Sequence, residues 1–140
     1  MWSSPAVIAP NNFVYKSLSN WAFNPTTNGQ FVTDQRGSPT IVSDLVVALR
    51  AFIVDRLPGT WHVTNQGALT WYELARVVLT AAGDNPGRVE AITSDRLDPP
   101  RPATRPANSE LENRALRLAG RPLLPHYRDS VDNLVRELIS

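Results

Sequence analysis

The sequence predicts an α/β fold, in an α+β-like lobe with few short strands and about five helices. Two observations predict it. Segments whose apolar residues recur at helical spacing alternate with short β-branched segments, and proline and glycine turns separate them. No internal repeat or domain boundary interrupts residues 1–140, so we expect a single lobe. Only about three short strands are visible, which is few for an independent sheet. The chain is therefore expected to be a lobe of something larger.

The first elements follow a proline-bounded start. A helix is expected from Asn11 or Asn12, either of which can cap it, to about Phe23. Residues 24–29 (Asn-Pro-Thr-Thr-Asn-Gly) break it, and residues 30–33 predict a brief strand.

A second helix is predicted over residues 41–56, since its apolar residues recur at steps of three and four: Val42, Leu45, Val46, Leu49, Phe52 and Ile53. Leu57-Pro58-Gly59 ends it. Residues 60–64 (Thr-Trp-His-Val-Thr) alternate and are β-branched or aromatic, which predicts a strand. Residues 65–67 predict a turn.

A capping box begins the next helix, because Thr70 and Glu73 have the spacing at which each side chain bonds the other's amide. Its apolar stripe comprises Leu74, Val77, Val78 and Ala81, and Gly83 ends it. A third strand is predicted over residues 88–93.

The loop over residues 94–108 is rich in proline and arginine, and we expect it to be ordered because regular elements flank it. Residues 109–112 (Ser-Glu-Leu-Glu) form a second capping-box pattern, which predicts a helix through Leu118 that Gly120 ends. A final helix is predicted over residues 126–139, with Val131, Leu134, Val135 and Leu138 on one stripe.

Composition excludes several classes of function. The formal net charge of +1 gives no bias toward nucleic acid or an anionic membrane. No apolar run approaches the roughly 20 residues of a membrane span. The absence of cysteine removes thiolate chemistry and disulfides, which fits a reducing cytoplasm. We therefore expect a cytoplasmic protein with no nucleic-acid partner, no membrane partner and no bound metal.

Two loop segments, residues 34–40 and 105–109, are the most informative about function. Each places an arginine, an amide side chain and a glycine or proline beside a helix start. Arginine donates a flat fork of N–H groups to phosphate, and a helix N-terminus adds free backbone donors. The combination indicates a ligand that carries phosphate and sugar.

These segments carry a resemblance to a known family, together with other matches in the same order: Asn12-Phe13-Val14, residues 32–40, Trp61-His62, residues 70–75 and residues 105–109. The pattern resembles the C-terminal, substrate-binding half of dTDP-4-dehydrorhamnose reductases, which are extended short-chain dehydrogenases. It covers essentially the whole chain. The resemblance implies a dTDP-linked nucleotide-sugar as ligand, and NADPH or NADH as the cofactor of the full-length family.

The resemblance also implies which residues bind. Arg105 is expected to reach the nucleotide-sugar or its diphosphate, and Gln35 to line the cleft. Asn12 resembles an asparagine that helps hold the substrate, and Trp2 an aromatic residue near cofactor and substrate. A structural role is also available for three of them: Arg105 as a solvated loop arginine, Gln35 as part of a turn, and Asn12 as a helix cap.

The catalytic machinery of such enzymes is not expected in this chain. Its seven glycines fit no G-x-G-x-x-G or G-x-x-G-x-x-G spacing, so we expect no cofactor bound by this chain alone. The only lysine, Lys16, has Asn12 four residues before it, and Tyr72 is followed at that spacing by Arg76. Because the Tyr-x-x-x-Lys pair is missing, no catalytic residue is predicted.

Three hypotheses remain. The first is a truncated or separately encoded reductase-like lobe of the dTDP-L-rhamnose pathway, which binds nucleotide-sugar and needs a separate Rossmann-lobe chain for catalysis. The second is a non-catalytic module for protein interaction or self-association, because the stripe over residues 41–54 is rich in apolar residues. The third is a poorly folded remnant of a decayed gene.

Overall fold

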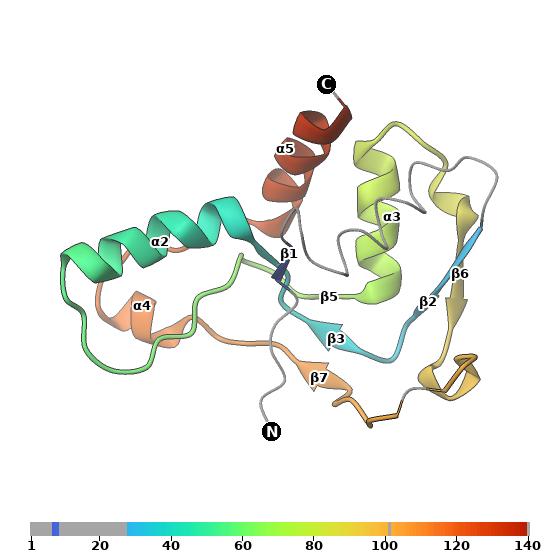
Figure 1. Ribbon diagram of the computed structural model, residues 1–140, viewed down its shortest axis with the longest axis horizontal. Coiled ribbons are helices and arrows are strands. Elements are labelled where there is room, and N and C mark those ends of the chain that lie inside the picture. The colour runs from blue at the N-terminus through green and yellow to red at the C-terminus, as the bar shows by residue number, and fades with distance from the viewer. Residues whose placement is uncertain (1–6, 9–27, 101, 140) are drawn as a thin grey trace.

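A computed structural model describes residues 7–8, 28–100 and 102–139. The helix expected over residues 11–23 lies outside them. In chain order the elements are β1 (Val7–Ile8), β2 (Gly29–Val32), β3 (Arg36–Gly37), β4 (Thr40–Ile41), α2 (Val42–Val54), β5 (Leu69–Thr70), α3 (Trp71–Ala81), η1 (Pro86–Arg88), β6 (Val89–Ile92), η2 (Ser94–Arg96), β7 (Asn108–Ser109), α4 (Arg114–Leu118) and α5 (Tyr127–Ile139). This mixture of few short strands with helices confirms the predicted α/β class (Figure 1).

The described strands form three small sheets. β1 pairs with β4 in parallel, and β2 pairs with β6 in parallel from Gly29↔Val89 to Val32↔Ile92. The third sheet has the order β5-β3-β7, in which β3 is antiparallel to β5 and parallel to β7. The strands predicted over residues 30–33 and 88–93 are thus confirmed as β2 and β6, and they pair with each other.

The core lies around α3, which packs between α5 and the β2–β6 pair (Figure 1). Ala75, Leu79 and Val131 are fully buried there, at 0% exposure. These residues come from the apolar stripes of α3 and α5, because a helix buries the face on which its apolar residues recur. The stripe predicted for the last helix is confirmed for Val131 and Val135, whereas Leu138 near its end is 39% exposed.

The capping box predicted for α3 is confirmed. The Thr70 hydroxyl accepts the Glu73 amide at 3.2 Å, and the Glu73 carboxylate accepts the Thr70 amide at 2.7 Å. The helix ends before Gly83, whose φ of +73° suits glycine. Both boundaries therefore follow from local sequence.

Replacing Thr70 with alanine is expected to lower the free energy of unfolding by about 1 kcal/mol, because the Glu73 amide loses its acceptor. Urea denaturation followed by circular dichroism measures the change. Thr80→Ala is the matched control, since the Thr80 hydroxyl bonds only to the Arg76 carbonyl of its own helix. An equal loss in both variants would contradict the capping role.

The strand predicted over residues 60–64 is wrong, because no neighbouring strand pairs with the segment in the described part of the chain. At Thr64, the side-chain amide of Asn113 takes the place of a neighbouring strand. Asn113 accepts the Thr64 amide through Oδ1 at 3.0 Å and donates Nδ2 to the Thr64 carbonyl at 2.9 Å. A buried side-chain amide can bond the backbone N–H and C=O of one residue in this way, without pairing the rest of the segment.

The second predicted capping box is also wrong. Ser109 lies in β7, where its hydroxyl donates to the Arg36 carbonyl at 3.1 Å, and the helix begins later, at Arg114. The N-cap residue Asn113 makes no capping bond with its side chain, which is engaged with Thr64. Pairing with β3 therefore outweighed the local cap signal, while the end near Leu118 and Gly120 is confirmed.

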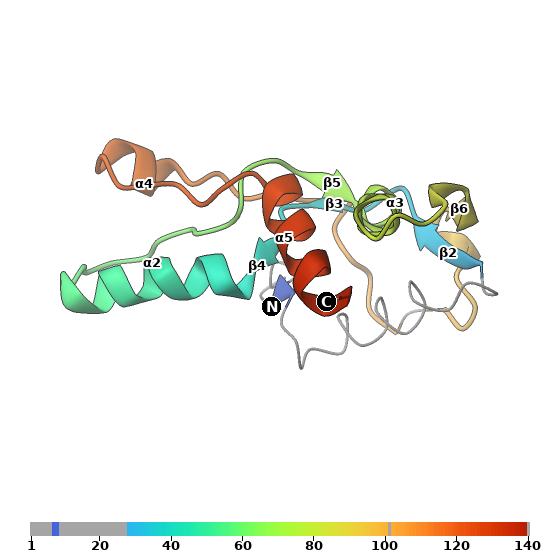
Figure 2. The same cartoon turned by 90° about the horizontal axis from the view of Figure 1, so that it is seen from above.

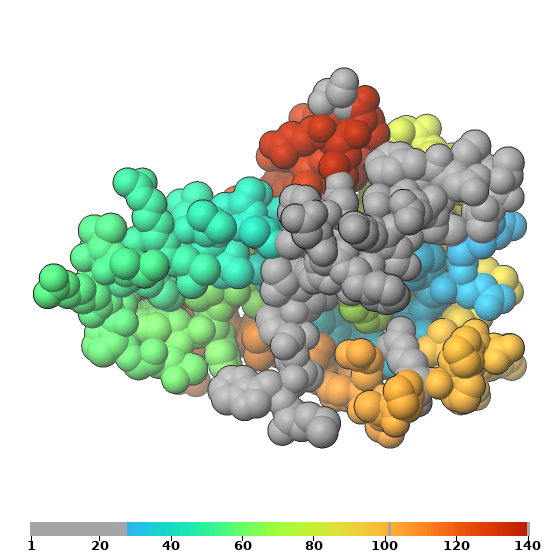
Figure 3. All heavy atoms as spheres, viewed as in Figure 1, coloured from blue at the N-terminus to red at the C-terminus, as the bar shows by residue number. Residues whose placement is uncertain are grey.

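Helix α2 is confirmed within the predicted range, but its apolar stripe is not part of the core. None of its residues is buried. It leaves the rest of the structure at β4 and extends to one end, as two perpendicular views show (Figures 1 and 2). Together with the segment that follows it, α2 forms that end of the molecular surface (Figure 3). In the described part of the chain, no helix has the length and apolar character needed to cross a membrane.

Candidate functional site

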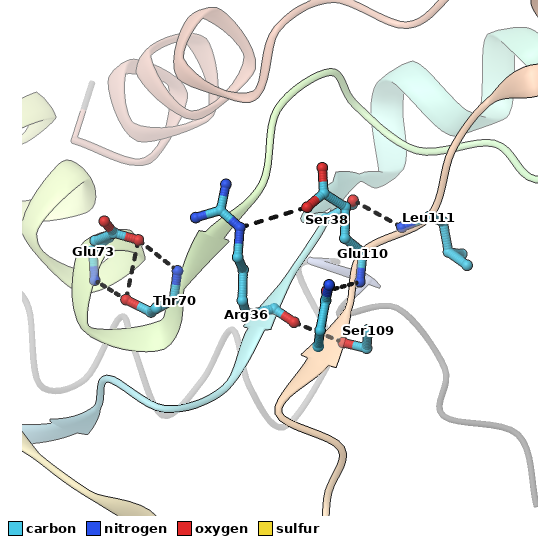
Figure 4. Close-up of polar contacts among 8 residues, drawn as sticks. Arg36, Ser38, Thr70, Glu73, Ser109, Glu110 and Leu111 are labelled. Atoms are coloured by element: carbon cyan, nitrogen blue, oxygen red, sulfur yellow. Dashed lines mark hydrogen bonds and ion pairs between the residues drawn. The ribbon is translucent and has the colours of Figure 1, made fainter.

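The two segments singled out by the sequence lie side by side. β3 and β7 pair in parallel, with Arg36 opposite Asn108 and Gly37 opposite Ser109. The Arg36 amide extends the pairing by donating to the Ala107 carbonyl at 2.8 Å. Residues 34–40 and 105–109 are therefore joined through their backbones (Figure 4).

Glycine at position 37 makes this approach possible. A Cβ atom at Gly37 would lie 2.9 Å from the Ser109 hydroxyl oxygen, closer than a carbon atom tolerates. The same hydroxyl donates to the Arg36 carbonyl. The small residue and the hydroxyl together fix the spacing of the two strands.

One side of this strand pair is polar. Arg36 and Ser38 lie on one face of their segment, and Asn108 and Glu110 lie on one face of theirs, since alternate residues of an extended chain share a face. Because Arg36 is opposite Asn108, the two faces lie on the same side of the strand pair. Arg36 Nε lies 3.5 Å from a Glu110 carboxylate oxygen (Figure 4). The Asn108 amide oxygen accepts the Glu110 N–H at 2.9 Å. The Ser38 hydroxyl accepts the Leu111 amide at 3.3 Å.

A pocket of about 350 Å³ opens beside these residues and is lined by Ser38, Asn65, Gln66, Gly67, Asn108, Glu110, Leu111, Glu112, Asn113 and Arg117. Two of its amides, Asn65 and Asn113, hold neighbouring segments together and are 1% and 3% exposed. Arg117 forms an ion pair with Glu112. The lining is therefore suited to hydroxyl groups more than to an apolar ligand, because amides and carboxylates dominate it.

The predicted site residues are only partly brought together. Arg105 is exposed and lies two residues before Ala107, and Gln35 directly precedes Arg36, so the Ala107–Arg36 hydrogen bond places them on neighbouring segments. Gln35 is 8% exposed, which leaves little of it accessible. Neither residue lines the pocket. Asn12 and Trp2 lie outside the described residues, and binding by all four stays a prediction.

Asp34 has a structural role. Its carboxylate accepts the Ser94 amide at 2.9 Å and the Ser94 hydroxyl at 2.6 Å. This contact anchors the beginning of the long loop over residues 94–108, and β7 anchors its end. The loop is thus fixed at both ends, which positions Arg105 between two anchors.

Sequence reasoning missed Ser38, Asn108 and Glu110 as a polar surface next to a pocket. A signal was present, because Arg36 with Ser38 and Asn108 with Glu110 have the two-residue spacing of one strand face. That spacing carries information only once both segments are known to be extended and paired. The helix predicted from Ser109 concealed it.

The described residues do not fit a dinucleotide. A pyrophosphate site needs glycines in the turn between a strand and the helix that follows it. Here the turns β4–α2 and β5–α3 contain none, and Gly83 and Gly120 follow helices. Gly67 faces His126 and Tyr127, which fill the space beside it. We therefore derive no step through a nicotinamide cofactor on these residues.

Other candidate chemistry has structural explanations. Arg76 donates to the Tyr72 hydroxyl at 2.7 Å along α3, one helical turn away, as an ordinary helix-surface pair. Among residues 7–8, 28–100 and 102–139, no three His, Asp or Glu side chains are grouped as metal ligands.

Comparison with known proteins supports the resemblance seen in the sequence. Residues 8–140 match the family model of the RmlD substrate binding domain. A dTDP-4-dehydrorhamnose reductase of Mycobacterium tuberculosis is 39% identical over 101 residues, covering 71% of this chain and 33% of the relative. One from Streptomyces griseus is 38% identical over 122 residues, covering 84% of this chain and 39% of the relative.

Solved structures show the same relation. A dTDP-4-dehydrorhamnose reductase from Clostridium acetobutylicum superposes with a TM-score of 0.84 at 27% identity, over 96% of this chain and 46% of that one. The Bacillus anthracis enzyme in complex with NADP superposes with a TM-score of 0.78 at 30% identity, over 94% and 44%. The chain thus spans less than half the length of these relatives. Since the family model covers nearly all of its residues, the chain belongs to the RmlD substrate binding domain family.

Proposed function

We propose that residues 1–140 form a single lobe that binds a dTDP-linked 4-keto sugar for a reductase of this family. The pairing of residues 34–40 with residues 105–109 carries the proposal, because it presents an arginine, amides and carboxylates along one edge of a small sheet. The reductase names of the relatives support the choice of ligand.

In this proposal Arg105 binds the diphosphate. It is exposed on a loop anchored at Ser94 and at β7, so its guanidinium reaches solvent from a fixed backbone. A charge-assisted hydrogen bond from arginine to phosphate is among the stronger polar contacts in proteins. Gln35, Asn12 and Trp2 complete the proposed contacts, on the sugar and nucleotide side.

The lobe's part in the reaction is to hold and orient the sugar. Hydride would come from NADPH or NADH on a cofactor-binding part, carried by the same or another polypeptide, and that part would also supply the proton donor. No residue of residues 1–140 is proposed as catalytic. The cytoplasmic location expected from the sequence stays a prediction.

The proposal is tested by isothermal titration of dTDP-L-rhamnose into the purified chain. Arg105→Ala is expected to weaken binding by at least about tenfold, since a hydrogen bond to a charged group contributes about 1.5–3 kcal/mol. Arg136→Ala on α5 is the matched control, because Arg136 is an exposed arginine in the last turn of another element. Its affinity should equal that of the unmodified chain.

Two outcomes would contradict the proposal. Equal affinity of the Arg105→Ala and Arg136→Ala variants would remove Arg105 from the site. If the unmodified chain shows no saturable binding with a Kd of about 1 mM (−4.1 kcal/mol) or tighter, the lobe does not hold the ligand. Titration with dTDP alone separates recognition of the nucleotide from recognition of the sugar.

A second candidate is a non-catalytic interaction module, and the exposed apolar surface of α2 favours it. In that case the purified chain binds a protein but no nucleotide-sugar. The same titration separates the two candidates, because only the first predicts heat from dTDP-L-rhamnose.

A further inference from the structure

The pocket beside β3 and β7 holds polar groups that the proposed contacts of the nucleotide-sugar do not use. Neither Arg105 nor Gln35 lines it, whereas Ser38 does. Gln35 directly precedes Arg36, so in an extended segment its side chain lies on the opposite side from those of Arg36 and Ser38. The pocket is therefore a separate candidate site, on the side of this segment away from Gln35.

Two residues of the pocket lining hold buried hydrogen-bond donors without an acceptor. Gln66 Nε2 is buried and has no partner in the described part of the chain. Ser38 is 4% exposed, and its hydroxyl accepts the Leu111 amide at 3.3 Å but donates to no other described residue (Figure 4). Because buried polar groups in folded proteins are nearly always bonded, unused donors at a pocket indicate that a ligand or water completes them.

The solvent side of the pocket adds acceptors and a further donor. One carboxylate oxygen of Glu110 lies 3.5 Å from Arg36 Nε, and one of Glu112 pairs with Arg117. Among the described residues, the second oxygen of each carboxylate has no partner. Asn108 uses its Oδ1 to accept the Glu110 amide, which leaves its Nδ2 to donate. A ligand in the pocket therefore meets donors and acceptors together.

The charges of the lining disfavour an anion. Of the described residues that line the pocket, Arg117 alone is cationic, and Glu112 pairs with it. With Glu110 the lining has two carboxylates and one guanidinium. Phosphate is bound by charged donors with surplus positive charge, which this pocket lacks. A hydroxyl group both donates and accepts, so a neutral ligand with several hydroxyl groups matches the lining better.

The size of the pocket agrees with a small ligand. Its volume of about 350 Å³ is near the lower end of the roughly 300–1,000 Å³ that ligand sites occupy. Leu111 is the one apolar side chain among the described residues that line it, and it offers a surface for the C–H face of a sugar ring. A single sugar ring therefore fits the volume and the chemistry better than a whole nucleotide-sugar.

We propose that this pocket is a second ligand site, which binds a neutral monosaccharide. Gln66 Nε2 and the Ser38 hydroxyl donate to oxygen atoms of the sugar, and sugar hydroxyls donate to the unpaired carboxylate oxygens of Glu110 and Glu112. Hydroxyl-to-carboxylate bonds are charge-assisted and so are the stronger of these contacts. The inference goes beyond the proposed function and does not depend on it, because Arg105 and Gln35 are not part of the pocket.

The test is an NMR titration of the whole ¹⁵N-labelled chain with D-glucose, D-galactose, D-mannose and L-rhamnose, and separately with inorganic phosphate. The side-chain NH₂ groups of Gln66 and Asn108 report on the pocket directly. We expect at least one sugar to shift both signals saturably, with a Kd of about 10 mM or tighter, and phosphate to shift neither. The NH₂ signal of Gln30, which donates to Glu90 at 3.0 Å between β2 and β6, is the reference and should not move.

Two substitutions test the groups that make the contacts. Gln66→Leu removes the unused donor but keeps the backbone bonds of this residue to Pro125 and Tyr127, and it is expected to weaken sugar binding at least about fivefold, followed at the Asn108 signal. Gln30→Leu is the matched control and should bind as the unmodified chain does. Glu110→Gln, which keeps the side-chain shape, is expected to weaken binding at least about threefold. The dispersion of the backbone amide signals shows whether each variant is folded.

Four results would overturn the inference: no saturable shift with any of the four sugars, a response of the pocket signals to phosphate alone, shifts confined to residues 34–36 and 104–106, or folded Gln66→Leu and Glu110→Gln variants that bind as tightly as the unmodified chain. A chain that binds a sugar in the pocket but no dTDP-L-rhamnose would refute the proposed nucleotide-sugar and support the second site. The two proposals therefore fail separately.

Discussion

Replacing Gly67 with alanine is expected to lower the free energy of unfolding by about 3–5 kcal/mol. The residue has a φ of +89°, which side chains other than glycine rarely adopt. A Cβ atom would also lie 2.7 Å from His126 Nε2 and 2.8 Å from Tyr127 Cε1. Two separate costs, backbone strain and steric overlap, therefore add at one position.

The backbone around Gly67 and the Tyr127 ring have little freedom to move away. The Gln66 amide donates to the Pro125 carbonyl, and the Tyr127 amide donates to the Gln66 carbonyl, each at 3.0 Å. The Tyr127 ring belongs to the core cluster and is 6% exposed. Relief of the overlap would disturb the beginning of α5.

Gly59→Ala is the matched control, because Gly59 has a φ of +91° but nothing within 4 Å of the added carbon. It carries the backbone cost alone, about 1–2 kcal/mol. Urea denaturation of both variants yields the difference, which isolates the contact with His126 and Tyr127. Equal losses would show that the loop adjusts to the methyl group.

Replacing Asn65 with alanine is expected to cost about 3 kcal/mol of unfolding free energy. The Asn65 side chain is 1% exposed, and its Oδ1 accepts the Ile41 amide at 2.8 Å. Its Nδ2 lies within hydrogen-bond distance of Asp44 Oδ2 (2.6 Å), the Pro125 carbonyl (3.1 Å) and Ser130 Oγ (2.9 Å). One amide thus ties together β4, the first turn of α2, the segment before α5, and α5.

The large cost comes from what alanine leaves behind. Ile41 is 2% exposed, so its N–H would remain buried without an acceptor, and Ser130 would lose its donor. Asn133→Ala is the control, an exposed asparagine of α5, and should change stability by less than about 0.5 kcal/mol. A loss below about 1 kcal/mol for Asn65→Ala, measured by urea denaturation, would contradict the network's importance.

Local sequence signals correctly predicted the elements whose boundaries depend on residues close together in the chain. The α3 helix was predicted from its capping box and Gly83, and the β2 and β6 strands from short apolar runs, because these boundaries depend on residues a few positions apart. The Ser109 capping box failed for the opposite reason. A hydroxyl that can cap a helix can equally bond a neighbouring strand, and the approach of β3 decided between them.

The candidate site divides in the same way. Residues 34–40 and 105–109 were each identified from their arginine, amide and turn residues, but nothing in either segment states that they pair. The contact of Gly37 with Ser109 and the Ala107–Arg36 hydrogen bond join positions about seventy residues apart. Loop sequences do not encode such long-range pairing locally.

The sequence by itself determined the family resemblance, the α/β class, the α3 boundaries and the two segments proposed to bind a nucleotide-sugar. Tertiary structure decided that these segments become adjacent strands, that residues 60–64 pair with no strand in the described part of the chain, and that the apolar face of α2 is exposed. The reason is physical: periodicity shows which side of an element is apolar, whereas burial depends on whether another surface is present to cover it.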